Sequence, residues 1–192
     1  MSSDPIRRFR RYWREAVAAG APLADAVALA TADAAGKPSV RFVLLKAADE
    51  RGFVVYTNKT SRKGRELAAN PYASLAVYWD ATGRQVRVEG RVVSVSVAEA
   101  DAYWLERPPA SRLASAASDQ SRTVASRAAL MARYRELEAA FPDGDVERPE
   151  HWSGYRIVPK RIEFWARAEP RLHKRELFTR TRDGWKKTLL QP

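Results

Sequence analysis

Residues 41–63 constrain the fold of this chain more than any other stretch. Two apolar runs at 42–45 and 53–56 are rich in β-branched and aromatic residues, and the connector at 47–52 holds two acidic residues and a glycine. Short runs of this composition, separated by turn-forming residues, are typical of a β-hairpin. The stretch therefore predicts two antiparallel strands, and with them a sheet around which the remaining elements are organised.

Basic residues flank this hairpin where a hairpin alone does not need them. Arg41 opens the first strand, Lys46 closes it, and Thr60-Ser61-Arg62-Lys63 lead from the second strand into a short helix expected at 64–70. Hydroxyl groups and cations at a strand-to-helix junction can bind an anion, because the free N–H groups and the dipole of the helix add to the side-chain charge. The alternative is a hairpin with a solvated basic rim.

The composition is that of a globular protein. The chain has 192 residues, of which 45% are apolar and 30% charged, and this length suits one domain over 1–192 with a real core. No apolar run approaches the roughly 20 residues of a membrane helix, and the N-terminal residues lack the apolar segment of a secretory signal. We therefore expect a cytoplasmic protein. The absence of cysteine excludes disulfides and thiolate metal sites.

The net charge of +11 is distributed along the chain. The 34 Lys and Arg residues do not form one block, and the densest cluster, at 7–11, falls on an expected helix, where it is most simply a solvated face. Nucleic-acid-binding proteins gather cations on one surface, because phosphate neutralisation supplies most of their non-specific affinity. We therefore expect phosphate-bearing small molecules as partners, and no nucleic acid.

The first expected element is a helix that begins with Asp4 as N-cap and Pro5 at its first position, and that ends at Gly20. Apolar residues recur in it at spacings of three and four, which is the period of an amphipathic helix. The predicted apolar stripe consists of Ile6, Phe9, Trp13, Ala16 and Val17.

Short strands make up most of the remaining chain. Besides the hairpin, strands are predicted at 26–32, from Ser39 onward, and at 73–79, 85–96, 155–158, 161–165, 176–181 and 185–190, with a bulge or bend at Gly90. A capping box at 96–99 begins a helix to about residue 107, residues 110–122 are expected to form a loop, and 123–141 a further helix. About seven or eight strands with peripheral helices predict an antiparallel barrel or sandwich.

Several kinds of site lack their motifs. The chain has no Gly-rich dinucleotide motif, no P-loop and no G-x-S-x-G elbow. Its two histidines, His151 and His173, are far apart in sequence and have no clustered carboxylates, so we expect no metal site. If residues 171–175 are extended as in a strand, alternation places Arg171, His173 and Arg175 on one face, where they favour contact with an anionic, planar ligand over burial in a core.

The order of motifs along the chain carries a family resemblance. Residues 41–46 read R-F-V-L-L-K, followed by Y-T-N at 56–58 and S-R-K at 61–63. The pattern continues through 84–86, Tyr103, 107–108, 120–121, 162–165 and 171–173. In this order the chain resembles the pyridoxamine (pyridoxine) 5′-phosphate oxidase family of FMN enzymes. The resemblance implies a mainly β fold, the FMN-binding split β-barrel, and a homodimer with FMN in the groove between subunits.

The resemblance also implies which residues form the site. The residues that would bind FMN are Arg41, Tyr56, Thr57, Ser61, Arg62, Lys63, Gln85, Gln120, Ser121, Trp165 and Arg175. The residues that would hold the substrate phosphate are Lys46, Tyr103, Arg107 and Ser111. Arg171 and His173 would contact the substrate ring beside the flavin as the catalytic pair. Taken singly, each has a simpler structural explanation, such as a core position for Trp165 or a helix cap for Arg107.

The implied reaction is the oxidation of pyridoxamine or pyridoxine 5′-phosphate to pyridoxal 5′-phosphate. In this family a hydride passes from the substrate C4′ to the flavin N5, and O2 reoxidises the flavin to give hydrogen peroxide. The flavin supplies the redox chemistry, while the protein supplies orientation and charge. Two phosphates in one groove would account for the many cations that the motifs contain.

The sequence departs from the family pattern in three places. Lys174 replaces the usual Asp, residues 189–192 read L-L-Q-P where R-L-A-P is common, and 114–118 lacks the usual tryptophan. The small Ala116 and the V-Y-W-D at 77–80 resemble related flavin oxidases of phenazine biosynthesis, which act on a larger tricyclic substrate without a phosphate. An FMN oxidase with a larger aromatic substrate, and a flavin-free basic binding module, therefore stay open as alternatives.

Overall fold

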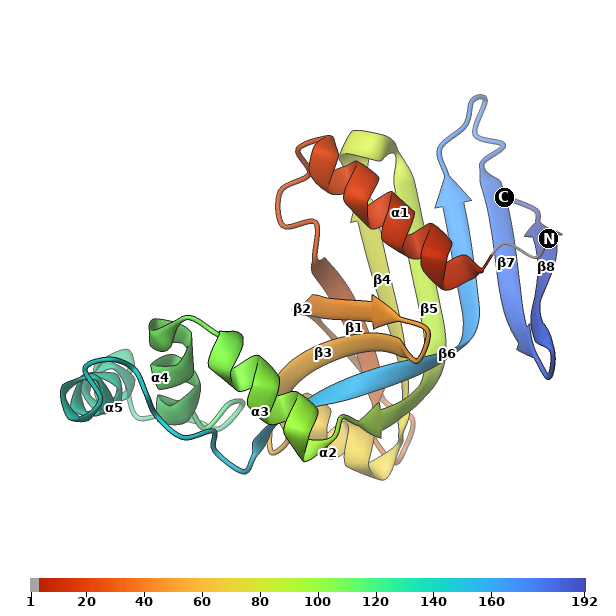
Figure 1. The fold of residues 1–192 in the computed structure, drawn as a ribbon. Coiled ribbons are helices and arrows are strands. Elements are labelled where there is room, and N and C mark those ends of the chain that lie inside the picture. Colours follow the sequence, from red (N-terminus) through yellow and green to blue (C-terminus); the bar gives the residue numbers. More distant parts are fainter. Residues whose placement is uncertain (1–3) are drawn as a thin grey trace.

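The computed structural model describes residues 4–192. Six antiparallel strands close into a barrel in the order β3-β2-β1-β4-β5-β6, and β3 pairs with β6 to complete it. Strands β7 and β8 continue the sheet beyond β6 as a hairpin, and the helices lie around the outside (Figure 1). The expected mainly β fold with peripheral helices is confirmed, while the first three residues of the predicted domain lie outside the described residues.

The elements follow one another in this order along the chain. They are α1 (Pro5–Ala18), β1 (Ala26–Ala32), β2 (Pro38–Asp49), β3 (Gly52–Asn58), α2 (Arg62–Ala69), β4 (Tyr72–Trp79), η1 (Asp80–Thr82), β5 (Arg84–Ser94), α3 (Val97–Glu106), α4 (Pro109–Ala117), α5 (Arg127–Ala140), β6 (Trp152–Ala166), β7 (Lys174–Thr181) and β8 (Gly184–Leu190). Most predicted elements are present within a few residues of their expected bounds. The helix bounds differ by up to four residues, as at α5, which begins at Arg127 although the sequence predicts 123.

Helix α1 covers one end of the barrel. The Asp4 side chain accepts a hydrogen bond from the Ile6 N–H at 2.9 Å, which confirms the predicted N-cap. Phe9 is fully buried and meets Phe53 edge to face, with 4.9 Å between ring centroids. One part of the predicted stripe is wrong: Val17 is 59% exposed, because it lies at the margin of the helix face, whereas Tyr12 is buried.

The bulge expected at Gly90 is confirmed, and it lies opposite a strand that the sequence divides wrongly into two. The register between β5 and β6 shifts between Glu89 and Gly90, and a Cβ on Gly90 would lie 2.1 Å from the Val158 carbonyl oxygen. The strands predicted separately at 155–158 and 161–165 form one long strand, β6. Pro159 lies opposite Gly90 at the bulge, where a missing N–H interrupts the ladder least.

The β2–β3 hairpin forms with longer strands than its sequence suggests, because β2 runs to Asp49 and the connecting turn is shorter than the predicted connector. The register with β3 shifts between Leu45 and Ala47, so Lys46 is the additional residue of a β-bulge. A bulge reverses the alternation of side chains along a strand. Lys46 thereby lines a cavity together with residues of α3 and α4.

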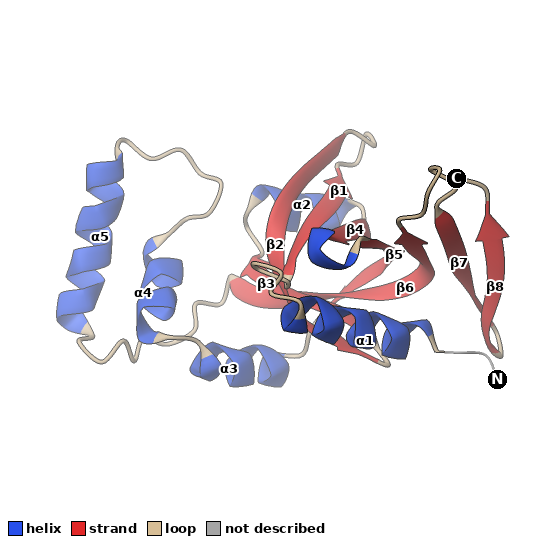
Figure 2. Ribbon diagram, turned by 90° about the horizontal axis from the view of Figure 1, so that it is seen from above, coloured by secondary structure: helices blue, strands red, loops and turns tan. Residues whose placement is uncertain are grey.

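The loop predicted at 110–122 is wrong in its first half, which forms α4. Serine-rich composition suggested a loop, but Pro109 occupies the first helical position, and Leu113 and Ala117 are 3% and 2% exposed. Tertiary packing therefore overrides the local signal. The next helix, α5, forms as expected but has no buried residue, and together with α4 it extends away from the barrel (Figure 2).

Helix α2 begins at the end of the hairpin and sits tightly against it. Ser61 caps the helix and accepts a hydrogen bond from the Gly64 N–H. A Cβ on Gly64 would lie 2.0 Å from the Lys59 carbonyl oxygen, which is backbone and cannot rotate away. Glycine is therefore required here by a close approach of two backbone segments.

Replacing Gly64 with alanine should lower the free energy of unfolding by about 1–3 kcal/mol. Helix propensity alone predicts the opposite, a gain of up to about 1 kcal/mol, because alanine favours helices over glycine. We expect the clash to outweigh the propensity, because the nearest atoms belong to the Lys59 backbone. Urea unfolding measures the difference, and a midpoint that stays the same or rises would contradict this prediction.

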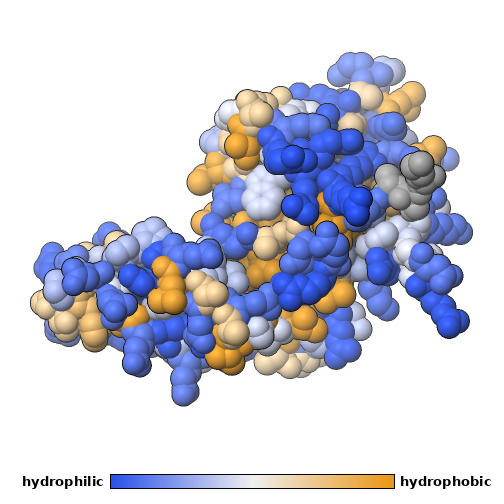
Figure 3. All heavy atoms as spheres, viewed as in Figure 1, coloured by the Kyte–Doolittle hydropathy of each residue, from blue (hydrophilic) through white to orange (hydrophobic). Residues whose placement is uncertain are grey.

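Over α1 the surface is mostly hydrophilic (Figure 3). Arginines of this helix project from it, consistent with the solvated basic face expected for 7–11, although Arg8 is an exception. Its guanidinium pairs with the buried Glu176 and lies 4.2 Å from the Phe164 ring centroid. Across residues 4–192, no helix is both long and apolar enough to cross a membrane.

Candidate active site

Two neighbouring cavities are lined in part by strands β2 and β3 of the barrel. The first, which we call the α2 cavity, has a volume of about 450 Å³ and is lined by Ser39, Val40, Arg41, Phe42, Val43, Tyr56, Thr57, Arg62, Lys63, Gln120 and Ser121. The second, the α4 cavity, has a volume of about 420 Å³ and is lined by Leu44, Lys46, Tyr56, Tyr103, Arg107, Pro108, Ser111, Ser115, Gln120 and Trp152. Because Tyr56 and Gln120 belong to both linings, the two cavities adjoin.

Lys63 is the most unusual group of the α2 cavity. The residue is 7% exposed, and its Nζ donates to Thr57 Oγ1 at 2.9 Å, to Gln120 Oε1 at 3.0 Å and to Ser61 Oγ at 3.3 Å. These partners are all neutral, and burial and the nearby Arg41 together lower the pKa of Lys63 to about 8. A buried cation held only by neutral groups is costly, so this cavity is suited to an anion.

Two arginines complete the cationic side of the α2 cavity. Arg41, on β2, donates from Nη1 to Thr31 Oγ1 at 2.5 Å and from Nη2 to Glu66 Oε2 at 3.2 Å. Arg62, in the first turn of α2, donates from Nε to Glu66 Oε1 at 2.8 Å. Three cations thus surround the first turn of a helix, whose free N–H groups also favour negative charge. The groups thus lie together at the strand-to-helix junction, and their role as an anion site stays a prediction.

Aromatic side chains separate the cations of the α4 cavity from the barrel core. The rings of Tyr56 and Tyr103 are stacked with 4.0 Å between centroids, and Trp152 stacks on Tyr56 at 5.4 Å. The guanidinium of Arg107 lies 4.7 Å from the Trp152 ring centroid and 5.0 Å from that of Trp104. Its buried Nη1 has no hydrogen-bond partner within residues 4–192, and burial lowers the pKa of Arg107. An anion in this cavity would supply the missing partner.

All four residues predicted to hold a substrate phosphate line the α4 cavity. They come from three separate elements: Lys46 from the bulge of β2, Tyr103 from α3, Ser111 from α4, and Arg107 from the α3–α4 junction. Lys46 also pairs with Asp25 at 3.0 Å. Lys46 and Ser111 are 65 positions apart in the sequence, and the packing of α3 and α4 against the hairpin brings them together.

Ser61 is the exception among the residues predicted around the α2 cavity. It is fully buried and caps α2, so its role in this chain is first of all structural. The other residues of that group, namely Arg41, Tyr56, Thr57, Arg62, Lys63, Gln120 and Ser121, line the cavity. Ser121 adopts a left-handed conformation, with φ of 69°, in the turn that follows α4.

A second group of predicted residues lies at another part of the barrel. Gln85 pairs with Trp165 across β5 and β6, and Trp165 pairs with Arg175 across β6 and β7. The ring of His173 lies 4.6 Å from that of Trp165. Arg175 donates from Nε to the buried Glu163 at 2.8 Å. None of these residues lines the α2 or the α4 cavity, so one chain does not bring all predicted site residues together.

Arg171 and His173 do not have the extended conformation that would place them on one face of a strand. β7 begins at Lys174, and Arg171 has a left-handed backbone with φ of 78°, in a turn closed by its N–H bond to Ala168 O. Strand alternation therefore does not orient these side chains. The His173 ring is instead held by the Ala168 N–H, which donates to Nδ1 at 3.2 Å, and it contacts the Trp165 ring at an interplanar angle of 47°.

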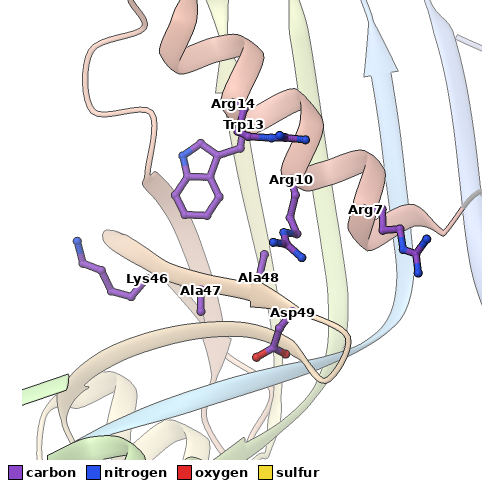
Figure 4. Close-up of a pocket in the computed structure, with 8 residues that line it drawn as sticks. All are labelled: Arg7, Arg10, Trp13, Arg14, Lys46, Ala47, Ala48 and Asp49. Carbon is purple, nitrogen blue, oxygen red and sulfur yellow. The ribbon is translucent and has the colours of Figure 1, made fainter. Parts of the chain in front are cut away.

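A hollow of about 700 Å³, larger than either cavity, lies between α1 and β2 (Figure 4) and shares Lys46 with the α4 cavity. Arg10 and Trp13 extend from α1 toward β2, whereas Arg7 points away. Its lining includes only one predicted site residue, Lys46. Its cations are exposed on a helix face, so size alone does not make it the site of chemistry.

Several residues of the two cavities escaped prediction from the sequence. Trp152 and Ser115 line the α4 cavity, and the buried Glu66 joins Arg41 to Arg62. One of these had a local signal: Glu66 lies in the helix expected at 64–70 and four positions after Arg62, the spacing at which opposite charges pair on a helix. The others depend on contacts between segments far apart in the sequence.

Comparison with known proteins identifies two family models along the chain. The first, described as pyridoxamine 5′-phosphate oxidase, matches residues 14–140. The second, described as the pyridoxine 5′-phosphate oxidase C-terminal dimerisation region, matches residues 152–192. Together they cover most of the chain and agree with the resemblance found in its motifs.

Similar proteins are named as oxidases of this kind. The pyridoxine/pyridoxamine 5′-phosphate oxidase of Anaeromyxobacter dehalogenans is 52% identical over 189 residues, covering 98% of this chain and 96% of that protein. The protein of the same name from Paraburkholderia phytofirmans is 50% identical over 191 residues, covering 98% of this chain and 89% of that protein. At such identity and coverage, the family assignment extends over the whole chain.

Solved structures agree with the fold. PhzG from Burkholderia lata 383, in complex with tetrahydrophenazine-1-carboxylic acid, has a TM-score of 0.95 and 38% identity, covering 99% of this chain and 93% of that one. A pyridoxamine 5′-phosphate oxidase-related, FMN binding protein from Nostoc punctiforme has a TM-score of 0.80 over both full chains, at 21% identity, and supports the fold alone. The predicted FMN-binding split barrel is confirmed, and the chain belongs to the pyridoxamine 5′-phosphate oxidase family of FMN-dependent oxidases.

Proposed function

We propose that this protein binds FMN and oxidises pyridoxamine or pyridoxine 5′-phosphate to pyridoxal 5′-phosphate. The observation that carries the proposal is a pair of buried cations in adjoining cavities. Lys63 has only neutral hydrogen-bond partners, and the Nη1 of Arg107 has no partner within residues 4–192. Two adjoining cation sites suit two phosphates, one on the cofactor and one on the substrate. The one-domain organisation and the cytoplasmic location stay predictions.

The α2 cavity fits the phosphate of FMN. Arg41, Arg62 and Lys63 supply positive charge around the first turn of α2, and no carboxylate is among the residues that line the cavity. Thr57 and Gln120 are already hydrogen-bonded to Lys63, so they hold the ammonium group in place. Tyr56 and Ser121 would flank the rest of the cofactor. When bound, FMN supplies the hydride acceptor and the route of electrons to O2.

The α4 cavity fits the phosphate of the substrate. Arg107 would supply a fixed, desolvated guanidinium, and Lys46, Tyr103 and Ser111 the further donors. Held at this end, the substrate would reach toward the neighbouring α2 cavity, where the flavin would be anchored. With amine substrate the overall reaction consumes O2 and H2O and releases NH3 and H2O2, and with the alcohol it consumes O2 and releases H2O2.

A homodimer would unite the two groups of predicted residues. Beside the α2 cavity, β2 exposes Val40 and Phe42 to 69% and 77%, and these would be covered by a second copy. The matched dimerisation region, residues 152–192, contains all of the second group except Gln85. We therefore propose that Gln85, Trp165 and Arg175 of a second copy complete the flavin site. Arg171 and His173 of that copy would orient the substrate ring.

A second candidate function is the oxidation of a larger aromatic acid. It is favoured by the similarity to PhzG, which was solved with a phenazine carboxylic acid. A carboxylate would also suit Arg107 and Ser111, so these residues do not by themselves require a phosphate. The space expected from Ala116 finds less support, because the residues of 114–118 that line the hollow next to Arg107 are Ala114, Ser115 and Ser118.

The purified protein should be yellow and dimeric, with about one FMN per chain, and should take up oxygen when given pyridoxamine 5′-phosphate. This expectation rests on the cations of the α2 cavity and on the exposed apolar residues of β2. Absorbance, light scattering and an oxygen electrode make the three measurements. A colourless monomer that ignores added FMN would exclude the flavin proposal. A yellow dimer that oxidises neither B6 phosphate would favour the larger aromatic acid.

A further inference from the structure

Glu66 is a buried carboxylate behind the cationic lining of the α2 cavity. It is 6% exposed, and its two oxygens have different partners. Oε1 accepts from Arg62 Nε at 2.8 Å, while Oε2 accepts from Arg41 Nη2 at 3.2 Å and from Ser39 Oγ at 2.6 Å, and also from Thr31. One carboxylate thus joins two strands and α2 beneath the proposed phosphate site.

A negative charge at this place needs an explanation, because it opposes the binding of an anion. Glu66 also stays ionised: burial raises its pKa, but hydrogen bonds from Ser39, Thr31, Arg62 and Arg41 lower the pKa to about 2. If charge alone mattered, a neutral residue would serve the cavity better. The geometry indicates a different role, since each carboxylate oxygen holds one arginine in a fixed direction.

We infer that Glu66 is a positioning residue for the phosphate of the cofactor. Held through Nε, Arg62 keeps both of its Nη groups without a partner within the described part of the chain, free to bind a ligand. Arg62 is otherwise a long side chain, 61% exposed, that would have to be ordered when the ligand binds. Glu66 orders it in advance. The identity of the phosphate as that of FMN rests on the proposed function.

A glutamine at this position separates charge from geometry. Glu66→Gln removes the negative charge, which by itself strengthens phosphate binding. If the amide oxygen keeps the bonds to Arg41, Ser39 and Thr31, the amide N–H group faces the Arg62 Nε–H, donor against donor. Arg62 is then released. A charge effect and a positioning effect therefore predict opposite changes in affinity.

Lys63 offers an independent measure of the charge of Glu66. The charged groups around Lys63 are Arg41 from β2 and Glu66 and Arg62 from α2, with Thr57 and Gln120 as neutral partners. Burial and Arg41 lower the pKa of Lys63 to about 8, whereas Glu66 raises it. Removing the charge of Glu66 should lower this pKa further, so FMN affinity should begin to fall at a lower pH than in the wild type.

The test is a titration of apoprotein with FMN, followed by quenching of flavin fluorescence. We expect E66Q to bind FMN about tenfold more weakly at pH 7, the effect of one charge-assisted hydrogen bond. E66D should also bind more weakly, because it keeps the charge but retracts the oxygens. Glu176→Gln is the matched control, since Glu176 is also buried and pairs with two cations, Arg8 and Lys187, away from the cavity. Its affinity should be unchanged.

A double-mutant cycle with Arg62→Ala completes the test. If Glu66 acts through Arg62, E66Q should weaken binding much less in the R62A protein than in the wild type. Thermal unfolding of each apoprotein reports folding, and E66D replaces E66Q in the cycle if the glutamine variant does not fold. The inference is overturned if E66Q binds FMN as tightly as the wild type or more tightly, or if the cycle is additive. Failure of the wild type to bind FMN would instead overturn the proposed function, and this inference with it.

Discussion

Replacing Arg107 with alanine should weaken binding of pyridoxamine 5′-phosphate by roughly 2–4 kcal/mol, or about 30- to 1,000-fold in dissociation constant. The guanidinium is half-buried against Trp104 and Trp152, its Nη1 has no partner in the described chain, and burial lowers its pKa. A substrate phosphate would therefore meet a cation that is already desolvated. Binding of substrate to anaerobic enzyme measures the effect, and FMN content should be unchanged.

Two further variants make the result specific. Arg107→Lys keeps the charge but lacks the planar fork, so it should recover only part of the affinity. Arg161→Ala removes an arginine that pairs with Glu89 on an exposed strand surface, and it should leave substrate affinity unchanged. Wild-type affinity in Arg107→Ala would mean that the phosphate is bound elsewhere. Loss of FMN together with substrate would mean that Arg107 belongs to the cofactor site.

Replacing Lys63 with methionine should lower FMN affinity about ten- to hundredfold while stabilising the apoprotein. The first effect is the loss of a charge-assisted contact to phosphate, roughly 1.5–3 kcal/mol. The second follows because Lys63 is 7% exposed and has only neutral partners, so an apolar side chain of similar length removes a buried charge. Fluorescence titration and urea unfolding of the apoprotein measure the two effects, and weaker FMN binding with lower stability would instead indicate misfolding.

The pH dependence of FMN binding should change in the same variant. Burial and Arg41 lower the pKa of Lys63 to about 8, so in the free protein the ammonium group loses its proton as pH rises through 8. Only the protonated form attracts phosphate, and wild-type affinity should therefore fall above about pH 8. Lys63→Met has no such proton, and its affinity should not show this decline. A decline of equal size in both proteins would assign it to another group.

The stability of the wild-type apoprotein should vary with pH in the opposite sense. An unfolded lysine keeps its proton until the pH approaches its usual pKa of 10.5, whereas Lys63 in the folded protein has a pKa of about 8. Between these values the unfolded state binds more protons, so the contribution of Lys63 to the free energy of unfolding rises with pH. Loss of the Lys63 proton should thus lower FMN affinity and raise the stability of the apoprotein, as expected of a buried cation whose role is to bind a ligand.

The sequence by itself determined the features that depend on neighbouring residues. Asp4 and Pro5 specify the start of α1, the capping box specifies the start of α3, and Gly90 marks the bulge between β5 and β6. In each case a few dihedral angles and one or two local hydrogen bonds decide the structure. The sequence likewise places cations around the hairpin, namely Arg41, Lys46 and the S-R-K motif.

Only the tertiary structure decided how those cations are used. Closure of the barrel and packing of α3 and α4 place Lys46 beside Arg107, bury Lys63 among neutral partners, and bring Glu66 between Arg41 and Arg62. These contacts form between strands and helices that are far apart in the sequence, so local sequence patterns do not predict them. The same packing turns a serine-rich stretch into α4 and leaves Arg171 and His173 outside a strand. Local propensity amounts to a fraction of a kcal/mol per residue, so long-range burial overrides it wherever the two disagree.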